Sequence, residues 1–296
     1  MHAVLSRRAW LAAASALAVA PAMEPAMAQG GPARRIVCIG GALTETLYLL
    51  GAQEELVGVD TTSLFPAVAQ KLPSVGYARV LSAEGLLSLR PTLVLAGGEA
   101  GPPVVLRQLE AARVPVVVLD DGHRAEGLFA RTLKLGELVG RASAGQALAA
   151  ALQSEWAAAR SSVAALSQGK PVPKLLFVLS HSMAQLRIGG SGTAADAVMA
   201  YAGARNAVAG LEGFKPLTPE AAIAAAPDVI LSTEQGLAAA GGIDGLLSAP
   251  GLAATPAGRA RRVVALEAQY LLGFGPRLPQ AVAQLAGLLH APLKTA

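Results

Sequence analysis

One sequence pattern occurs twice in this chain, at residues 82–95 and at residues 218–231. Each copy begins with a hydroxyl residue that can cap a helix, and each has a glutamate in the first helical turn. A short apolar helix, a proline and a strand-like apolar run complete each copy. Internal repetition of this kind predicts two similar α/β lobes. Two lobes form a cleft between them, which favours ligand capture over catalysis.

Strand-like and helix-like segments alternate along both halves of the chain. The expected strands are 36–39, 56–60, 116–119, 174–179 and 262–266, and the expected helices are 43–50, 193–202 and 279–289. Residues 180–192 are expected to form a polar loop. Such alternation is typical of parallel sheets covered by helices, in which ligands bind at the carboxyl ends of the strands.

A helix-prone stretch, residues 124–166, separates the two halves, and Gly140 predicts a break within it. The part after the break, about 143–166, would be about 36 Å long at 1.5 Å per residue, enough to span two lobes. The expected fold class is therefore α/β, with two Rossmann-like lobes that contain parallel sheets and are joined by a long linker helix, and with the ligand cleft between them. The expected boundaries are 29–142 for the N-terminal lobe, 143–167 for the linker helix and 168–296 for the C-terminal lobe.

The first residues have the pattern of an export signal. Ser6-Arg7-Arg8 is charged, residues 9–20 are largely apolar, and Ala26-Met27-Ala28 is a small-residue cleavage site. The apolar run is too short for a membrane span. We therefore expect residues 1–28 to be a signal peptide that is cleaved near Ala28. No cysteine lies at the cleavage junction, so lipid anchoring is not expected.

Composition excludes some classes of function. Cys38 is the only cysteine, so it cannot form an internal disulfide, and its apolar neighbours predict a buried strand. The formal net charge is only +4, and the sequence contains no basic cluster interleaved with aromatic residues. Both observations argue against nucleic-acid binding. The hydrophobic content of 53% owes much to alanine and does not indicate a membrane protein.

Motifs of enzymes are missing from the sequence. There is no Walker A motif and no Gly-x-Gly-x-x-Gly after a strand. The segment 189–193 approaches a nucleophile elbow, but Thr193 occupies the final glycine position, so a turn with a helix cap is the simpler interpretation. The histidines are not spaced as a metal-binding pair, which argues against a metal site built from histidines alone. We do not expect an enzyme.

One tyrosine stands out in a chain with 4% aromatic residues. Tyr77 lies in the loop that leads into the first copy of the repeat, and Arg79 follows two residues later. A phenolate is a hard ligand that suits ferric iron, and tyrosine is a known axial ligand of haem. A nearby cation stabilises the phenolate over the phenol. The alternative is a loop tyrosine that packs on the surface.

Several segments together resemble one family. They are 75–79, 81–85, 192–197, 219–220, 227–230, 242–247, 250–251, 255–258 and 272–277. Along nearly its whole length the chain resembles the periplasmic haem-binding proteins that serve Gram-negative haem ABC importers. The resemblance implies the helix-hinged fold that these proteins share with cobalamin- and siderophore-binding proteins.

The same resemblance implies the ligand, the partners and the location. The ligand is haem b (hemin), which a monomeric protein captures in the periplasm and delivers to an ABC permease dimer in the inner membrane. Tyr77 becomes the axial ligand of the haem iron, and Arg79 becomes its electrostatic partner. Related proteins sometimes offer a side chain from the second lobe, for which His181 is the candidate here. Met183 is a weaker candidate, and a polar loop histidine that contacts no haem is the alternative.

The repeat places Glu84 and Glu220 at equivalent points of the two lobes. In the resembling fold such glutamates dock into arginine pockets on the two permease subunits. The alternative is a charge that stabilises a helix start by about 0.3–1 kcal/mol. Glu45, in the first expected helix, is interpreted as a solvated residue. Some relatives have an arginine near the position of Glu234 and Gln235, so this pocket would lack one positive contact.

Two other functions stay open at this point. The first is a binding protein for cobalamin or a ferric siderophore, which would not depend on Tyr77. The second is an enzyme, which would need a nucleophile and a base that the sequence does not offer.

Overall fold

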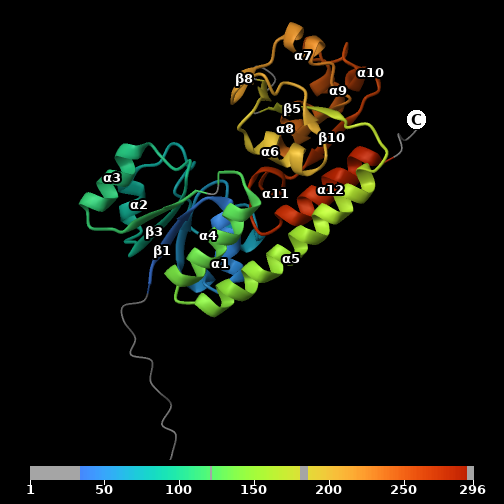
Figure 1. Cartoon of the computed structure of the whole chain (residues 1–296). Coiled ribbons are helices and arrows are strands. Elements are labelled where there is room, and N and C mark those ends of the chain that lie inside the picture. Colours follow the sequence, from blue (N-terminus) through green and yellow to red (C-terminus); the bar gives the residue numbers. More distant parts are fainter. Residues whose placement is uncertain (1–33, 121, 181–185, 292–296) are drawn as a thin grey trace, which may run out of the picture. The chain divides into compact units, whose positions relative to one another are not determined.

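The computed structural model describes residues 34–120, 122–180 and 186–291. They form two α/β lobes that are joined by a long helix (Figure 1). All five expected strands are confirmed, three of them with the expected ends: 36–39, 116–119 and 174–179. Within the described residues, no helix is both long enough and apolar enough to span a bilayer.

The N-terminal lobe contains a four-stranded parallel sheet with the order β2-β1-β3-β4. Its strands are β1 (Ile36–Ile39), β2 (Leu56–Val59), β3 (Leu93–Gly97) and β4 (Val116–Leu119). Its helices are α1 (Gly41–Leu49), α2 (Ala83–Ser88), α3 (Pro103–Ala111) and α4 (Ala125–Leu138), with 3-10 helices at Gln53–Glu55 and Ala67–Lys71.

Helices cover both faces of this sheet. Because side chains alternate along a strand, Ile36 and Cys38 join one cluster with α1 and α4, whereas Val37 and Ile39 join another with α2 and α3. All four side chains are completely buried. A strand that is buried on both faces needs a continuous apolar sequence, which is what residues 36–39 supply.

The C-terminal lobe contains a six-stranded sheet with the order β10-β9-β5-β6-β8, and β7 pairs with β5. Its strands are β5 (Lys174–Leu179), β6 (Arg187–Gly189), β7 (Arg205–Asn206), β8 (Phe214–Pro216), β9 (Val229–Thr233) and β10 (Val263–Leu266). Its helices are α6 (Ala194–Tyr201), α7 (Pro219–Ala225), α8 (Glu234–Ala239), α9 (Gly242–Leu247), α10 (Pro256–Arg259), α11 (Ala268–Leu272) and α12 (Leu278–His290).

This second sheet is mixed, in contrast to the parallel sheet that the sequence predicts. β6 runs antiparallel to β5, and β8 runs antiparallel to β6. The prediction of a loop throughout residues 180–192 was also wrong, because β6 lies within them. The chain returns from β5 to β6 over too few residues for a parallel crossover, so the pair must be antiparallel. On the other side of β6, Gly190 allows the segment before β8 to approach closely, because a Cβ atom on it would lie 1.9 Å from the carbonyl oxygen of Leu211.

The two copies of the repeat adopt the same local structure. The hydroxyl of Ser82 accepts a 3.3 Å hydrogen bond from the N–H of Gly85 at the start of α2. The hydroxyl of Thr218 accepts a 3.1 Å bond from the N–H of Ala221 at the start of α7. Each helix leads into a central strand, β3 in one lobe and β9 in the other. The repeat is therefore one structural unit used once in each lobe.

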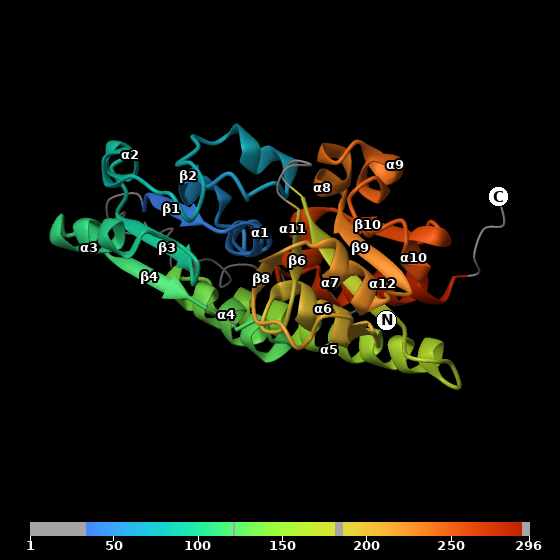
Figure 2. The same cartoon turned by 90° about the horizontal axis from the view of Figure 1, so that it is seen from above.

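The expected linker is the helix α5 (Ala142–Ser167), which has 26 residues and is about 39 Å long. It begins after Gly140, whose positive φ of 70° ends the preceding chain segment. α5 packs on α4 of the N-terminal lobe and on α12 of the C-terminal lobe, and both views show it running beside both (Figures 1 and 2). Gly136 and Gly145 let α4 and α5 approach closely, since a Cβ on Gly136 would lie 2.8 Å from the Cα of Gly145.

A second attachment between the lobes consists of Glu45, Gln269 and Arg277, which we call the Glu45 cluster. Arg277 donates from Nε to Glu45 Oε1 over 2.8 Å and from Nη2 to Glu45 Oε2 over 3.1 Å. The Gln269 amide donates to Glu45 Oε2 over 3.2 Å and to the Gly41 carbonyl over 3.0 Å. Its oxygen accepts from the N–H groups of Leu64 and Phe65 over 2.9 and 3.0 Å.

The interpretation of Glu45 as a solvated residue was wrong, because its exposed fraction is only 3%. The first seven residues of α1 are all buried, so this helix has no solvated face at that end. Burial raises the pKa of Glu45 above its usual value, although the hydrogen bonds and the charge of Arg277 act in the opposite direction.

Candidate ligand-binding site

The predicted tyrosine lies on the loops that follow the carboxyl ends of the N-terminal strands, which is where parallel α/β sheets bind ligands. Asp60 comes directly after β2 and organises this edge. Its carboxylate accepts the N–H of Gly40, after β1, over 2.8 Å and the N–H of Thr62 over 3.0 Å. The exposed fraction of Asp60 is 2%, so the loops after β1 and β2 are held together from inside.

Backbone hydrogen bonds clamp the loop of Tyr77 on both sides. On one side the N–H of Thr61 donates to the carbonyl of Gly76 over 3.0 Å. On the other, the N–H of Gly101 donates to the carbonyl of Ala78 over 2.8 Å. Gly76 has a φ of +88°, a conformation that glycine adopts without strain. The Tyr77 side chain is 45% exposed while Ala78 is buried, so a fixed backbone presents an accessible phenol.

Arg79 forms an ion pair with Glu99, a residue that sequence motifs did not identify. Arg79 Nε donates to Glu99 Oε2 over 3.1 Å, and Nη2 donates to the same oxygen. The hydrogen bond with Glu99 raises the pKa of Arg79, and the charges of Glu99 and Tyr77 add to the effect. One sequence signal could have identified Glu99, since it follows the carboxyl end of β3.

Two apolar side chains on the same loops are exposed. Val80, which follows Arg79, is 73% exposed, and Phe65, in the segment after β2, is 42% exposed. The Arg277 guanidinium lies 3.9 Å from the centroid of the Phe65 ring, so Phe65 connects this edge to the Glu45 cluster. Exposed apolar groups beside a phenol and a cation suit a ligand with an apolar body and anionic substituents.

In the C-terminal lobe, the corresponding strand ends carry polar groups. Gln235, after β9, donates to Glu267 Oε1 over 3.2 Å and accepts the N–H of Ala268 over 3.0 Å. Ser180, after β5, is 4% exposed, and its hydroxyl has no hydrogen-bond partner among the described atoms. His181 and Met183, the predicted second-lobe candidates, lie outside the described residues.

Comparison with known proteins identifies the family. A family model described as periplasmic binding protein matches residues 36–270. The chain belongs to the periplasmic binding protein family. Among solved structures, the periplasmic heme-binding protein BhuT in complex with two hemes is 51% identical, with a TM-score of 0.83, over 87% of this chain and 98% of that one.

Other proteins are also similar to this chain. The apo form of the periplasmic heme-binding protein RhuT from Roseiflexus sp. RS-1 is 42% identical, with a TM-score of 0.83, over 87% of this chain and 98% of that one. A vitamin B12-binding protein of Pectobacterium carotovorum is 34% identical over 87 residues, which are 29% of this chain and 32% of that protein. Proteins of this binding-protein family are not enzymes, in agreement with the expectation from the sequence.

The repeat glutamates are exposed at the starts of two helices. Glu84 is exposed in the first turn of α2, and Glu220 is exposed in the first turn of α7. Neither forms an ion pair with another of the described residues. The structure therefore places one accessible carboxylate at the same point of each lobe.

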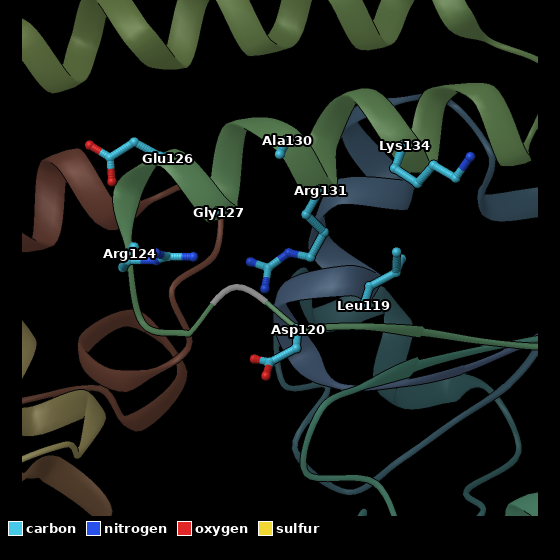
Figure 3. A pocket seen from close by; sticks show the side chains of 8 residues that line it. All are labelled: Leu119, Asp120, Arg124, Glu126, Gly127, Ala130, Arg131 and Lys134. Carbon is cyan, nitrogen blue, oxygen red and sulfur yellow. The ribbon is translucent and has the colours of Figure 1, made fainter.

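A cavity of about 610 Å³ lies where β4 leads into α4 (Figure 3). Its lining consists of Leu119, Asp120, Arg124, Glu126, Gly127, Ala130, Arg131 and Lys134. In Figure 3 the side chains of Arg124 and Arg131 extend into the space between α4 and the loop of Asp120. Arg131 also donates to the carbonyl of Phe274 in the other lobe. This cavity contains none of the predicted site residues, and within the described residues no group of three or more His, Cys, Asp or Glu could hold a metal ion.

Proposed function

We propose that this protein captures haem and delivers it to an ABC permease. The observation that carries the proposal is the position of Tyr77, an accessible phenol on a clamped loop at the ligand-binding edge of a parallel sheet. The similarity to a heme-bound family member at 51% identity supports the same ligand.

Each residue has a distinct task in this proposal. Tyr77 supplies a phenolate oxygen as the axial ligand of ferric haem b, and the positive charge of Arg79 favours that phenolate. Val80 and Phe65 offer apolar contacts to the porphyrin. His181 remains a proposed contact from the second lobe, to the other haem face or to a second haem.

We infer the partners and the location from the family. The partner is an ABC permease dimer in the inner membrane, which Glu84 and Glu220 would contact through one lobe each. Residues 1–28 would act as a signal peptide that directs a monomer to the periplasm. Residues 29–142 and 168–296 would then be the two lobes, with 143–167 as the linker.

Cobalamin is the second candidate ligand, because part of this chain is similar in sequence to vitamin B12-binding proteins. A cobalamin site would not need the Tyr77 oxygen. Titrating the purified protein with cyanocobalamin and with haemin therefore separates the two candidates.

The decisive test is a haemin titration of the wild type and of Tyr77→Phe, followed by absorbance. The wild type should develop a Soret band and a tyrosinate charge-transfer band. Tyr77→Phe keeps the ring but removes the donor oxygen, so it should lose the charge-transfer band and bind much more weakly. Tyr48→Phe, in α1, is the matched control and should behave as the wild type. An unchanged spectrum and affinity in Tyr77→Phe would remove Tyr77 from the site.

A further inference from the structure

We propose that Glu99 weakens haem binding by offsetting the charge of Arg79, so that the site holds its ligand less tightly than Tyr77 and Arg79 alone would. This inference rests on the proposed function. It assigns a role to a residue for which neither the repeat nor the resemblance gave one.

The charge of Glu99 offsets that of Arg79. Arg79 directs two of its donors, Nε and Nη2, to one oxygen of Glu99. The pair is neutral as a whole, so a phenolate at Tyr77 gains less from Arg79 than it would from an unpaired guanidinium. The Glu99 carboxylate therefore opposes the formation of the Tyr77 phenolate, which Arg79 favours.

Backbone hydrogen bonds fix the position of Glu99. The N–H of Gly101 donates to the carbonyl of Ala78, and the N–H of Leu81 donates to the carbonyl of Gly101 over 2.9 Å. These bonds hold the Glu99 loop against the Tyr77 loop without any help from the ion pair. Gly98 fits against the strand-end residue Asp120, because a Cβ atom on it would lie 2.8 Å from Asp120 Cγ. Glu99 is therefore held beside Arg79 by its loop.

The ion pair itself has little value for stability. The side chains of Arg79 and Glu99 are 56% and 53% exposed. Exposed ion pairs of this kind contribute little to folding. Replacing Glu99 should therefore leave the fold intact, and its effect can be measured on ligand binding.

The experiment compares haemin dissociation constants and dissociation rates in three backgrounds. Glu99→Gln in the wild type should bind haemin about tenfold more tightly and release it more slowly, the size expected for removing one charge interaction near a protein surface. In the Arg79→Ala background the substitution should have no effect. In the Tyr77→Phe background it should also have no effect.

Two further variants serve as controls. Glu110→Gln removes an equal charge from an exposed position of α3 and should leave the affinity unchanged. Glu99→Asp keeps the charge and should stay closer to the wild type than Glu99→Gln does. The gain from Glu99→Gln should shrink at high salt, because salt screens exposed charges.

Weaker or unchanged binding in Glu99→Gln would overturn the inference. An equal gain in Tyr77→Phe would overturn it as well, since Glu99 would then act on the ligand and not on the phenolate. Failure of the proposed function looks different, because the wild type itself would then show no tyrosinate band with haemin.

Discussion

Glu45 and Arg277 lie 232 positions apart in sequence and are joined by two hydrogen bonds of 2.8 and 3.1 Å. The side chain of Glu45 is 4% exposed and that of Arg277 is 25% exposed. The guanidinium also lies over the rings of Phe65 and Tyr270, at 3.9 and 5.2 Å from their centroids. One arginine thus neutralises a carboxylate of the other lobe and packs on aromatic rings from both lobes.

Removing that arginine should destabilise the protein strongly. Arg277→Ala leaves Glu45 buried without its cation, so the free energy of unfolding should fall by about 3–5 kcal/mol. Urea denaturation followed by circular dichroism measures this loss. The double variant Glu45→Gln with Arg277→Ala should regain part of it, because no buried charge remains.

The exposed pair of Lys134 and Glu137 provides the control. Glu137→Gln should change the free energy of unfolding by less than about 1 kcal/mol. If Arg277→Ala had an effect no larger than Glu137→Gln, the Glu45 cluster would not be a structural attachment between the lobes.

The raised pKa of Glu45 predicts a pH dependence. Because its pKa is raised above the ordinary value of 4.5, Glu45 binds a proton more strongly in the native state than in the unfolded state. The free energy of unfolding of the wild type, relative to Glu45→Gln, should therefore rise as the pH is lowered from neutral towards that ordinary value. Arg277, Gln269 and Glu267 face the carboxyl and are identical in both proteins. Urea denaturation of both proteins across this pH range measures the difference in their free energies of unfolding. A difference that falls or stays constant as the pH is lowered would contradict the prediction.

Cys38 should be inert in the folded protein. It is completely buried in β1, and burial raises the pKa of its thiol to about 12. A thiol reagent at about pH 8 should therefore react with it only when the protein opens, because the thiolate is the reactive form. The rate should rise steeply with added urea. Fast labelling of the native protein would show that β1 is accessible.

The repeat glutamates should matter for delivery and not for binding. Replacing both Glu84 and Glu220 with alanine should leave the haemin affinity within about twofold. Stimulation of the reconstituted permease ATPase should fail, because an unpaired interfacial arginine costs about 2–5 kcal/mol.

The exposed glutamates Glu110 and Glu212, one in each lobe, are the matched control pair. Their double alanine variant should stimulate the ATPase normally. Normal stimulation by the Glu84 and Glu220 variant would instead reduce those residues to helix-start charges.

Features with a local signal could be predicted from the sequence. Residues 36–39 and 174–179 are short apolar runs beside turn residues, and the long helix is marked by its lack of proline. The repeat identified one capped helix and one central strand in each lobe. Tyr77 was found because aromatic residues are rare and because its segment resembles a known family.

Features that depend on distant partners could not be predicted. The strand β6 has three residues and exists because β5 and β8 pair with it. Glu45 has the pattern of a surface helix residue, and only Arg277 and Gln269 explain its burial. Glu99 meets Arg79 through two loops that follow different strands.

The two attachments between the lobes, α5 and the Glu45 cluster, have a kinetic consequence. A hinge opens about one axis, but here an opening motion would have to bend a continuous helix or break a buried ion pair. Ligand exchange should then be governed by the exposed side chains of the site itself, such as Tyr77 and Arg79. Exposed side chains reorient in picoseconds to nanoseconds, whereas domains open in microseconds to milliseconds. Haem association should consequently be a single fast phase that depends linearly on haem concentration, without the plateau that a slow opening step would impose.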